Sequence, residues 1–569
     1  MEHQRILYIL LALVSLLTGG CRKCPDYLPR TPEASDRVIC MDLAPLCPSD
    51  RLAVVSLQGL ANRNHAEIFT YATYYTEWTL EFYKQRGYIK EATPVASMEE
   101  LLFKYKDAAR GIVVYDTTCL ATINLATNIA GVHDCVIAGP DNLEQVRAAL
   151  DKPVLFDLRE NKFTGEYDTF EWYWENIFPL QRHDVLSVAP NDGSVHDIYQ
   201  DFYDIYRDYL VEFNIPVFWL PGHQDADFDP RHEAQILKLF QETPANIPIL
   251  GFWPAGPGLV KGYREFDGVK LAGEYGKFTL VNTHAGSYSW QSGVKIKNSR
   301  FRQRAPRAKK TPAYDPGKKY VALVMIESGD APCYYQYHGL YQRQWNDPDR
   351  GKVPISYGIT PSLRMLAPAI LEDLYATQTE NDFFFNAITG AGYCYPFEGY
   401  GSLTTNPDST LTDYFSRLTA GNMRLMDLDM LGLYTHSGDG WSERDRDIAE
   451  KYISPMKGVR SILSGMHRTV YTASQAHERI PGGKTVHHTV TFWSYDDLIW
   501  NDPALDDAAV AHMVKEIQEN GDGPFIQAMF YSWHYGPRRL KKLQDKLKPL
   551  GYEFVTMKEF DELYRQSLQ

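Results

Sequence analysis

The 569-residue chain has few long apolar runs, and it has no surplus of positive charge. Apart from an apolar stretch near the amino terminus, no run approaches the roughly 20 residues that span a bilayer. The formal net charge is −14, whereas nucleic acids are bound by surfaces rich in Lys and Arg. The composition therefore predicts a large globular protein that neither spans a membrane nor binds nucleic acid.

Several common catalytic motifs are also absent. The chain has no Gly-x-Ser-x-Gly elbow, no His-Glu-x-x-His helix and no Walker loop. No two histidines are four residues apart, which argues against a metal-dependent polysaccharide deacetylase with a His-x-x-x-His pair. The eight cysteines include no paired Cys-x-x-Cys units with zinc-site spacing. We therefore expect neither a metal ion nor a cofactor.

The amino terminus resembles an export signal. Arg5 precedes an apolar stretch at residues 6–17, which is followed by Thr18-Gly19-Gly20-Cys21. This order is typical of a secretory signal peptide, and a cysteine at the cleavage point indicates a bacterial lipoprotein. Thr18 stands where leucine is usual, so an ordinary signal peptide cleaved elsewhere is the alternative. We expect a signal peptide at 1–20, a lipidated tether at 21–36 and a protein anchored to an envelope membrane, periplasmic or at the cell surface, through lipid on Cys21 alone.

Export also permits disulfide bonds, because the periplasm is oxidising. By their spacing, Cys40 and Cys47 could pair, as could Cys119 and Cys135.

Three small α/β domains are expected before residue 301, at 37–115, 116–190 and 191–300. The elements expected in them are strands at 52–57, 111–116, 135–138, 154–156, 217–220 and 247–252 and helices at 67–85, 143–150 and 195–213. A run rich in Lys, Arg and Pro at 301–317 marks the next boundary. We interpret it as a solvated basic linker rather than a binding patch.

From residue 318 to 569, short apolar runs alternate with helical stretches. The runs are at 321–326, 355–359, 383–388, 430–434, 461–463, 489–493, 525–530 and 553–556, and helices are expected at 507–519 and 538–547. Apolar strands that alternate with helices indicate a parallel sheet covered on its faces. The pattern predicts an α/β fold in which an irregular (β/α) barrel of seven or eight strands follows the small α/β domains.

The most informative stretch is Gly390-Ala391-Gly392-Tyr393-Cys394-Tyr395-Pro396, which follows the strand expected at 383–388. Its glycines permit backbone conformations that other residues avoid. Tyr393 and Tyr395 offer flat apolar faces with polar tips, which suit a sugar ring. The aromatic content of 13% fits such a surface and also fits a large core. A tight turn packed by aromatic side chains is the alternative interpretation.

This heptad matches in full the signature of the GxGYxYP family of putative glycoside hydrolases, and the chain resembles that family elsewhere too. Residues 56–63, with the sequence Ser-Leu-Gln-Gly-Leu-Ala-Asn-Arg, resemble the family's amino-terminal segment. Arg350-Gly351, Pro354-Ile355, Thr360-Pro361 and Ala367-Pro368 resemble its approach to the signature. The resemblance covers the chain from about residue 38 to the end. It implies a glycan substrate and glycoside hydrolysis outside the cytoplasm.

In a (β/α) barrel the active site lies where the strands end. Glycoside hydrolysis needs two carboxyl groups, one protonated and one ionised. Asp330 and Asp439 are the preferred pair, because each follows a strand in a Ser-Gly-Asp turn, and Glu398 is the third candidate. The substrate-binding candidates are Tyr393, Tyr395, His436, Trp441, Asp496, Trp533 and His534.

Each of these candidates also has a structural interpretation. An aspartate in a Gly-rich turn often bonds to its own backbone, and Glu398 could be an ordinary surface residue. Asp496 fits a helix cap, and the two histidines could be structural. In addition, the family carries Ser-Asp-Gly-Asp-Asn after the first barrel strand, whereas this chain has Glu-Ser-Gly-Asp-Ala at 327–331. That difference leaves a glycan-binding lipoprotein without catalysis as the alternative function.

Overall fold

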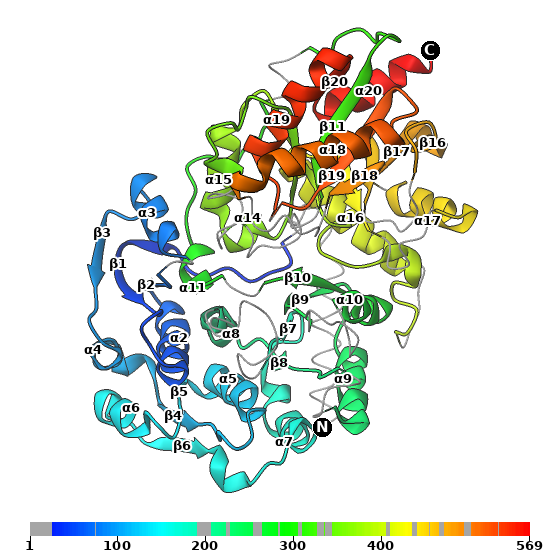
Figure 1. Cartoon of the computed structure of the whole chain (residues 1–569). Coiled ribbons are helices and arrows are strands. Elements are labelled where there is room, and N and C mark those ends of the chain that lie inside the picture. Colours follow the sequence, from blue (N-terminus) through cyan, green and yellow to red (C-terminus); the bar gives the residue numbers. More distant parts are fainter. Residues whose placement is uncertain are drawn as a thin grey trace.

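The computed structural model describes residues 26–73, 76–190, 206–222, 228–253, 265–282, 285–304, 310–326, 335, 344–404, 410–434, 441–454, 456–465, 471–493, 502–532 and 534–569. Within these ranges, three small sheets precede one sheet of ten strands. Figure 1 shows the small sheets in the lower half of the molecule and the large sheet in the upper half. The predicted α/β class, with small domains before a large C-terminal sheet, is confirmed.

The first domain has a parallel sheet in the order β2-β1-β3. Its elements are β1 (Ala34–Asp42), α2 (Pro48–Asn62), β2 (Ala66–Tyr71), α3 (Glu77–Gln85), β3 (Glu91–Pro94) and α4 (Met98–Lys104). The strand predicted at 52–57 is wrong, because these residues lie in α2, which has a proline in its first turn and is buried on most sides. The predicted helix at 67–85 begins only at Glu77, because residues 66–71 pair with β1.

The second and third domains also have parallel sheets, in the orders β5-β4-β6 and β10-β9-β7-β8. The second contains β4 (Gly111–Val114), α5 (Thr122–His133), β5 (Cys135–Ala138), α6 (Leu143–Leu150), β6 (Val154–Asp157) and α7 (Glu166–Asn176). The third contains β7 (Leu186–Val188), α8 (Arg207–Phe213), β8 (Val217–Phe218), α9 (Pro230–Glu242), β9 (Ile247–Gly251), α10 (Glu265–Glu274), β10 (Lys277–Val281) and α11 (Tyr288–Gln291). The predicted elements here are confirmed, except that residues 195–205 of the expected long helix lie outside the described ranges.

The family-like segment at 56–63 lies in and just after α2 and joins the three small domains. Gly59 faces α8 so closely that a Cβ atom there would lie 2.3 Å from the carbonyl oxygen of Asp208. Arg63 donates to Asp134 at 2.5 Å and to the carbonyl oxygen of Val211 at 2.5 Å. Asn62 donates to Ser289 at 2.9 Å. The glycine, the amide and the guanidinium of this segment are therefore explained by packing between domains.

The cysteines expected to pair are free thiols in the structure. Cys40 is buried in β1, whereas Cys47 is exposed at the start of α2 with its Sγ 4.0 Å from Asp141. Cys119 lies 3.9 Å from the hydroxyl of Thr169, and Cys135 is buried in β5. The proposed Cys40–Cys47 and Cys119–Cys135 disulfides are therefore wrong for this structure, because each thiol packs against other neighbours.

The C-terminal sheet has the order β16-β17-β15-β14-β13-β12-β11-β19-β18, and β20 also pairs with β11. Its strands are β11 (Lys319–Met325), β12 (Ile355–Ile359), β13 (Asp382–Asn386), β14 (Met430–Leu433), β15 (Ser461–Ser464), β16 (His477–Ile480), β17 (Lys484–His488), β18 (Thr491–Trp493), β19 (Phe525–Phe530) and β20 (Tyr552–Phe554). Its helices are α14 (Leu363–Leu366), α15 (Pro368–Thr377), α16 (Thr410–Leu425), α17 (Glu443–Ile453), α18 (Asp506–Asn520), α19 (Pro537–Leu547) and α20 (Met557–Ser567).

All eight strands predicted in this domain are present, and all pairs are parallel except β16 with β17. The sheet curls, so that strands far apart in its order approach each other. The side-chain amide of Gln527 in β19 donates to the hydroxyl of Thr489, which directly follows β17, at 3.1 Å. His477 of β16 lies 2.9 Å from the carbonyl oxygen of Phe525 in β19. The C-terminal sheet is therefore a curled half-barrel, and its closure into a barrel of seven or eight strands stays a prediction.

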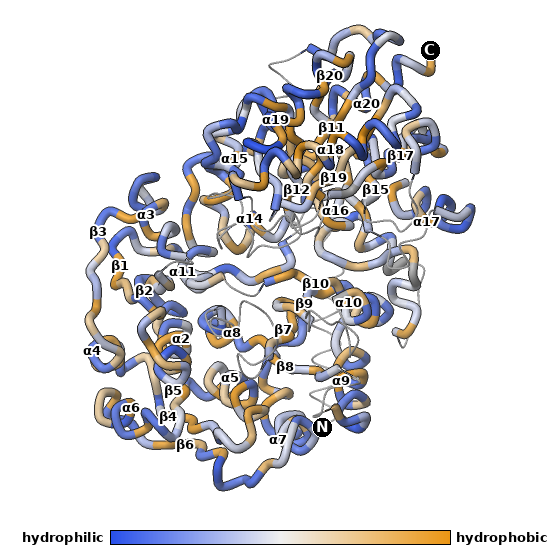
Figure 2. Tube along the Cα trace, in the orientation of Figure 1, coloured by the Kyte–Doolittle hydropathy of each residue, from blue (hydrophilic) through white to orange (hydrophobic). Residues whose placement is uncertain are grey.

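Apolar residues concentrate on the strands of the large sheet, and polar residues cover outer helices such as α17 (Figure 2). In the part of the chain that the structure describes, none of the helices has the length and apolar character needed to cross a membrane.

Candidate functional site

The signature segment connects the large sheet to the third domain. It follows β13, and Tyr393 exchanges two backbone hydrogen bonds of 2.8 Å with Thr279 of β10. Figure 1 shows β9 and β10 between the large sheet and the rest of the amino-terminal half. The carboxyl end of β13 therefore faces the sheet of the third domain.

The glycines of the signature are required by close approaches. Gly390 has a φ of +143°, and a Cβ atom there would lie 2.3 Å from Thr419 Oγ1 and 2.7 Å from the hydroxyl of Tyr452. A Cβ atom on Gly392 would lie 2.5 Å from Phe278 of β10. Any larger side chain at either position would push α16 or β10 away from the loop.

The two tyrosines of the signature are buried and pack against each other. Tyr393 and Tyr395 are 1% and 2% exposed, and their hydroxyl groups lie 2.8 Å apart. The ring of Tyr393 also meets the edge of Tyr434, which directly follows β14, at 6.2 Å between centroids. The two side chains expected to contact a sugar therefore lie side by side near the carboxyl ends of β13 and β14, with their rings covered.

Trp441 joins the same region. It is 5% exposed and meets Phe397, just beyond the signature, edge to face at 5.2 Å between centroids. Its ring also lies 5.2 Å from that of His488, the last residue of β17. Tyr471 stacks on His488 at 4.3 Å and accepts the backbone N–H of Trp441 at 3.0 Å. Aromatic side chains thus gather in two groups near the ends of β13, β14 and β17, one around Tyr393 and one around Trp441.

A histidine–carboxylate pair borders the group around Trp441, and the sequence did not indicate it. His488 Nε2 lies 3.2 Å from Glu478 of β16, which also accepts a 2.8 Å hydrogen bond from Arg446. Burial lowers the pKa of His488, whereas the hydrogen bond from His488 lowers the pKa of Glu478. Both directions fit a neutral imidazole of His488 that donates its N–H to an ionised carboxylate of Glu478. The adjacent His487-His488 could have directed attention here, but the pair requires a hairpin that was not predicted.

Several buried polar atoms near these strand ends have no hydrogen-bond partner among the described residues. They are Asn386 Oδ1 at the end of β13, Thr389 Oγ1 just after it, Trp441 Nε1, and Trp493 Nε1 at the end of β18. The amide nitrogen of Asn386 is held by the carbonyl oxygen of Gly390 at 3.1 Å. A buried polar atom without a partner costs roughly 1–3 kcal/mol. Such atoms gathered at one edge of the sheet are what a polar ligand would satisfy.

The remaining predicted residues lie elsewhere or outside the described ranges. His534 follows β19, on the other side of β11 and β12 from the signature, and its carbonyl oxygen accepts a 2.6 Å hydrogen bond from Arg539. Glu398 ends a short 3-10 helix at 396–398, and its side chain is not among those described. The residues outside the described ranges are Cys21, Asp330, His436, Asp439, Asp496 and Trp533. Within the described residues, no three His, Cys, Asp or Glu side chains are grouped to hold a metal ion.

The fold and this edge define a multidomain α/β protein whose large curled sheet carries aromatic and polar side chains at the carboxyl ends of its strands. The chain belongs to the GxGYxYP family, which confirms the resemblance seen in the sequence. The profile described as "GxGYxYP putative glycoside hydrolase C-terminal domain" matches residues 317–565. Profiles for the first, second and third domains of the same family match residues 38–107, 109–178 and 200–293.

One solved structure agrees with this placement at the level of the fold. A putative hydrolase from Bacteroides thetaiotaomicron VPI-5482 is 16% identical, with a TM-score of 0.76 over 95% of this chain and 97% of that one. A putative polysaccharide deacetylase from Mycobacterium smegmatis is 12% identical, with a TM-score of 0.29 over 46% of this chain and 96% of its own. The latter similarity is too low to carry an argument. No curated protein sequence matches the chain.

Proposed function

We propose that this protein is a glycoside hydrolase that acts on a glycan outside the cytoplasm. The observation that carries the proposal is found at the carboxyl ends of the strands, where Tyr393, Tyr395 and Trp441 accompany buried polar atoms that have no partner among the described residues. Family membership supports it, because the C-terminal domain is described as a glycoside hydrolase domain. In the proposal the curled sheet is an irregular (β/α) barrel of seven or eight strands, with the glycan at its carboxyl edge.

The proposed chemistry uses two carboxyl groups. One is protonated and donates its proton to the glycosidic oxygen, while the other is ionised and acts as base or nucleophile. Asp330 and Asp439 are the proposed pair, with Glu398 as the third candidate, because each follows a strand of the large sheet. Aromatic rings and polar groups for the sugar would come from Tyr393, Tyr395, His436, Trp441, Asp496, Trp533 and His534.

The test begins with a glycan panel that identifies a substrate by product release. On that substrate, Asp330→Asn and Asp439→Asn should each lower turnover by about 10²–10⁴-fold, since an amide can neither donate nor accept the proton. Asp507→Asn is the matched control, because Asp507 is 98% exposed at the start of α18. Full activity in both site variants would show that the pair is wrongly assigned, whatever the control does.

A glycan-binding protein without catalysis is the second candidate, favoured by the Glu-Ser-Gly-Asp-Ala segment at 327–331. Titration calorimetry combined with product analysis separates the two functions. Saturable binding of a glycan with no product over long incubation would favour the binder. A product that requires the wild-type chain and disappears in Asp330→Asn would exclude it.

We also propose that Cys21 becomes the lipidated first residue of the exported chain, because it directly follows the apolar stretch and Gly19-Gly20. Several acyl chains hold a protein firmly at a membrane, whereas one holds it only marginally. Cys21→Ala should therefore move the protein from the membrane fraction to the soluble fraction, and Cys24→Ala should leave it in place. Wild-type protein found soluble with another amino terminus would replace anchoring with simple secretion.

A further inference from the structure

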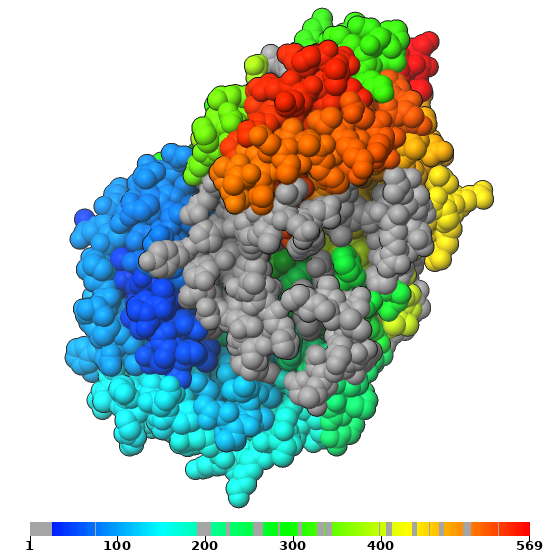
Figure 3. Space-filling model, viewed as in Figure 1, coloured from blue at the N-terminus to red at the C-terminus, as the bar shows by residue number. Residues whose placement is uncertain are grey.

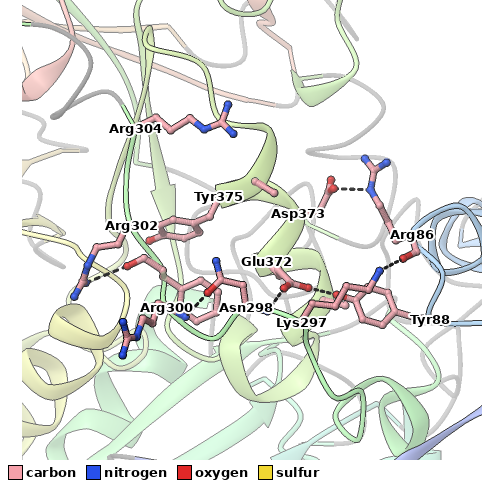
Figure 4. A pocket seen from close by; sticks show the side chains of 13 residues that line it. Arg86, Tyr88, Lys297, Asn298, Arg300, Arg302, Arg304, Glu372, Asp373 and Tyr375 are labelled. Atoms are coloured by element: carbon pink, nitrogen blue, oxygen red, sulfur yellow. Dashed lines mark hydrogen bonds and ion pairs between the residues drawn. The ribbon is translucent and has the colours of Figure 1, made fainter.

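A cavity lies where the first domain meets α15. Its volume is about 490 Å³, and the charged side chains in its wall are those of Arg86, Lys297, Arg300, Arg302, Arg304, Glu372 and Asp373 (Figure 4). In the space-filling view, green residues of the C-terminal domain lie against blue residues of the first domain on this side (Figure 3). The cavity is thus formed jointly by the two domains and by the chain segment that enters the large sheet.

That segment belongs to the predicted basic linker, and its first residues are packed rather than solvated. Phe301 is 3% exposed, and its ring lies 5.1 Å from that of Tyr375. Gln303 is 1% exposed and bonds in both directions with the backbone of Phe384 in β13, at 2.9 and 2.7 Å. Because alternate residues are held inside, Arg300, Arg302 and Arg304 are directed outward at fixed places.

The wall carries more positive than negative charge. Five cationic side chains face two carboxylates, and both carboxylates are already engaged. Asp373 forms a 2.5 Å ion pair with Arg86, and Glu372 accepts hydrogen bonds from the hydroxyl of Tyr88 and the backbone N–H of Asn298. This surplus of positive charge is local, because the whole chain has a formal net charge of −14.

The guanidinium groups of Arg300 and Arg304 have no acidic partner among the described residues, whereas Arg302 lies 3.6 Å from Asp427. Lys297 lies 4.8 Å above the ring of Tyr88 and donates to a backbone carbonyl oxygen rather than to a carboxylate. Figure 4 shows Arg304 and Arg86 on opposite sides of the labelled residues, with Tyr375 and Asp373 between them. Exposed guanidinium groups with open donors bind carboxylates, sulfates and phosphates in a two-point geometry.

We propose that this cavity is an accessory binding site for an acidic glycan, such as a polymer of uronic acids. The surplus of cations favours an anionic ligand, and cationic side chains placed around the wall from Arg86 to Arg304 suit a ligand with more than one negative charge. The choice of a glycan over another oxyanion rests on the proposed function, whereas the binding of an anion does not. Such a site would hold an acidic polymer on the outside of the large sheet while another part of it reaches the carboxyl edge.

The experiment measures binding directly, so its result does not depend on whether the protein cleaves anything. The full chain carrying Cys21→Ala, which needs no detergent, is titrated with a hexamer of galacturonic acid, with its neutral methyl ester, with inorganic phosphate and with vesicles containing phosphatidylglycerol. The acidic hexamer should bind at least about tenfold more tightly than the ester, and its affinity should fall as salt is added. The double variant Arg300→Glu/Arg304→Glu should reduce that affinity about tenfold or more at an unchanged Tm.

Arg147→Glu is the control for an Arg-to-Glu change outside the cavity, because it makes half the charge change of the double variant at an exposed position of α6 in the second domain. It should leave the affinity for the hexamer within about twofold of wild type. Equal binding by wild type and the double variant, or no binding of the hexamer to wild type, overturns the proposal. If the wild type instead binds phosphate or the vesicles and not the hexamer, and the double variant loses that binding, the assignment to a glycan is overturned.

Discussion

Gly390→Ala is expected to lower the free energy of unfolding of the C-terminal domain by roughly 3 kcal/mol. The φ of +143° at this residue disfavours a side chain, and the added Cβ would lie 2.3 Å from Thr419 Oγ1. Thr419 cannot simply turn away, because its Oγ1 accepts the backbone N–H of Ala391 at 3.0 Å. Calorimetry should show a Tm lower by roughly 6–12 °C for a domain of this size.

Gly551→Ala provides the control for backbone strain alone. Gly551 also has a positive φ, of +87°, but a Cβ atom there would meet nothing within 4 Å. Its replacement should cost only about 1 kcal/mol, from the conformation itself. If the two variants lose the same stability, the collision with α16 is not what fixes the glycine in the signature.

The same loop shows how far sequence could predict the site. The glycines and tyrosines were correctly identified as a special turn, but their partner Thr279 lies far away in the chain, and no local pattern indicates it. Tyr393 therefore suggested a ligand surface, whereas the structure shows its backbone joined to the third domain and its ring covered. The alternative interpretation, a tight turn packed by aromatic side chains, therefore fits the structure of this loop.

The sequence predicts strands correctly where both faces of the sheet are covered by other elements. Phe383-Phe384-Phe385 and similar runs are apolar because both faces of a parallel sheet are covered, and these runs were all found. The hairpin β16–β17 was missed because it is an edge hairpin with His477, Glu478 and Lys484 among its residues. As a consequence, the pairing of His488 with Glu478 could not be predicted, since it exists only across that hairpin.

The error at residues 52–57 has a different cause. Leu52 to Leu57 is apolar without a clear period, which fits either a buried strand or a helix that is buried on most sides. Pro48 and Asp50 in the first turn favour the helix, and the contacts of Gly59 and Arg63 show why it must be buried. Tertiary packing, rather than local propensity, decides between the two.

A buried ionic network under the large sheet provides the largest stability effect that we expect. Asp561 of α20 is fully buried and accepts hydrogen bonds from Ser461 of β15 at 2.7 Å and from His487 of β17 at 3.1 Å. Arg565 and Arg460 approach its other oxygen at 2.9 and 3.1 Å. Burial by itself would raise the pKa of Asp561, but the hydrogen bonds from His487, Arg565 and Thr485 outweigh it and lower the pKa below its usual value.

Asp561→Asn should therefore lower the free energy of unfolding by about 3–5 kcal/mol at pH 7, because it leaves Arg565 without its counter-charge and removes one of the carboxylates beside Arg460. Since the folded-state pKa lies below the unfolded value of about 3.9, this contribution is complete above roughly pH 5 and is lost as the pH falls through the folded-state pKa. Urea unfolding of wild type and variant at pH 7 and at pH 3 should show the difference shrinking in acid.

Asp545→Asn is the matched control for this measurement. Asp545 pairs with Lys541 on the neighbouring helix α19, but its side chain is 61% exposed, and such pairs contribute about 0.3–0.5 kcal/mol. If Asp561→Asn lowers the free energy of unfolding no more than Asp545→Asn does, solvent reaches the network, and its charges do not hold α20 against β15 and β17. A large loss that is equal at pH 7 and pH 3 would instead assign the effect to packing, because protonation of the carboxylate would then change nothing.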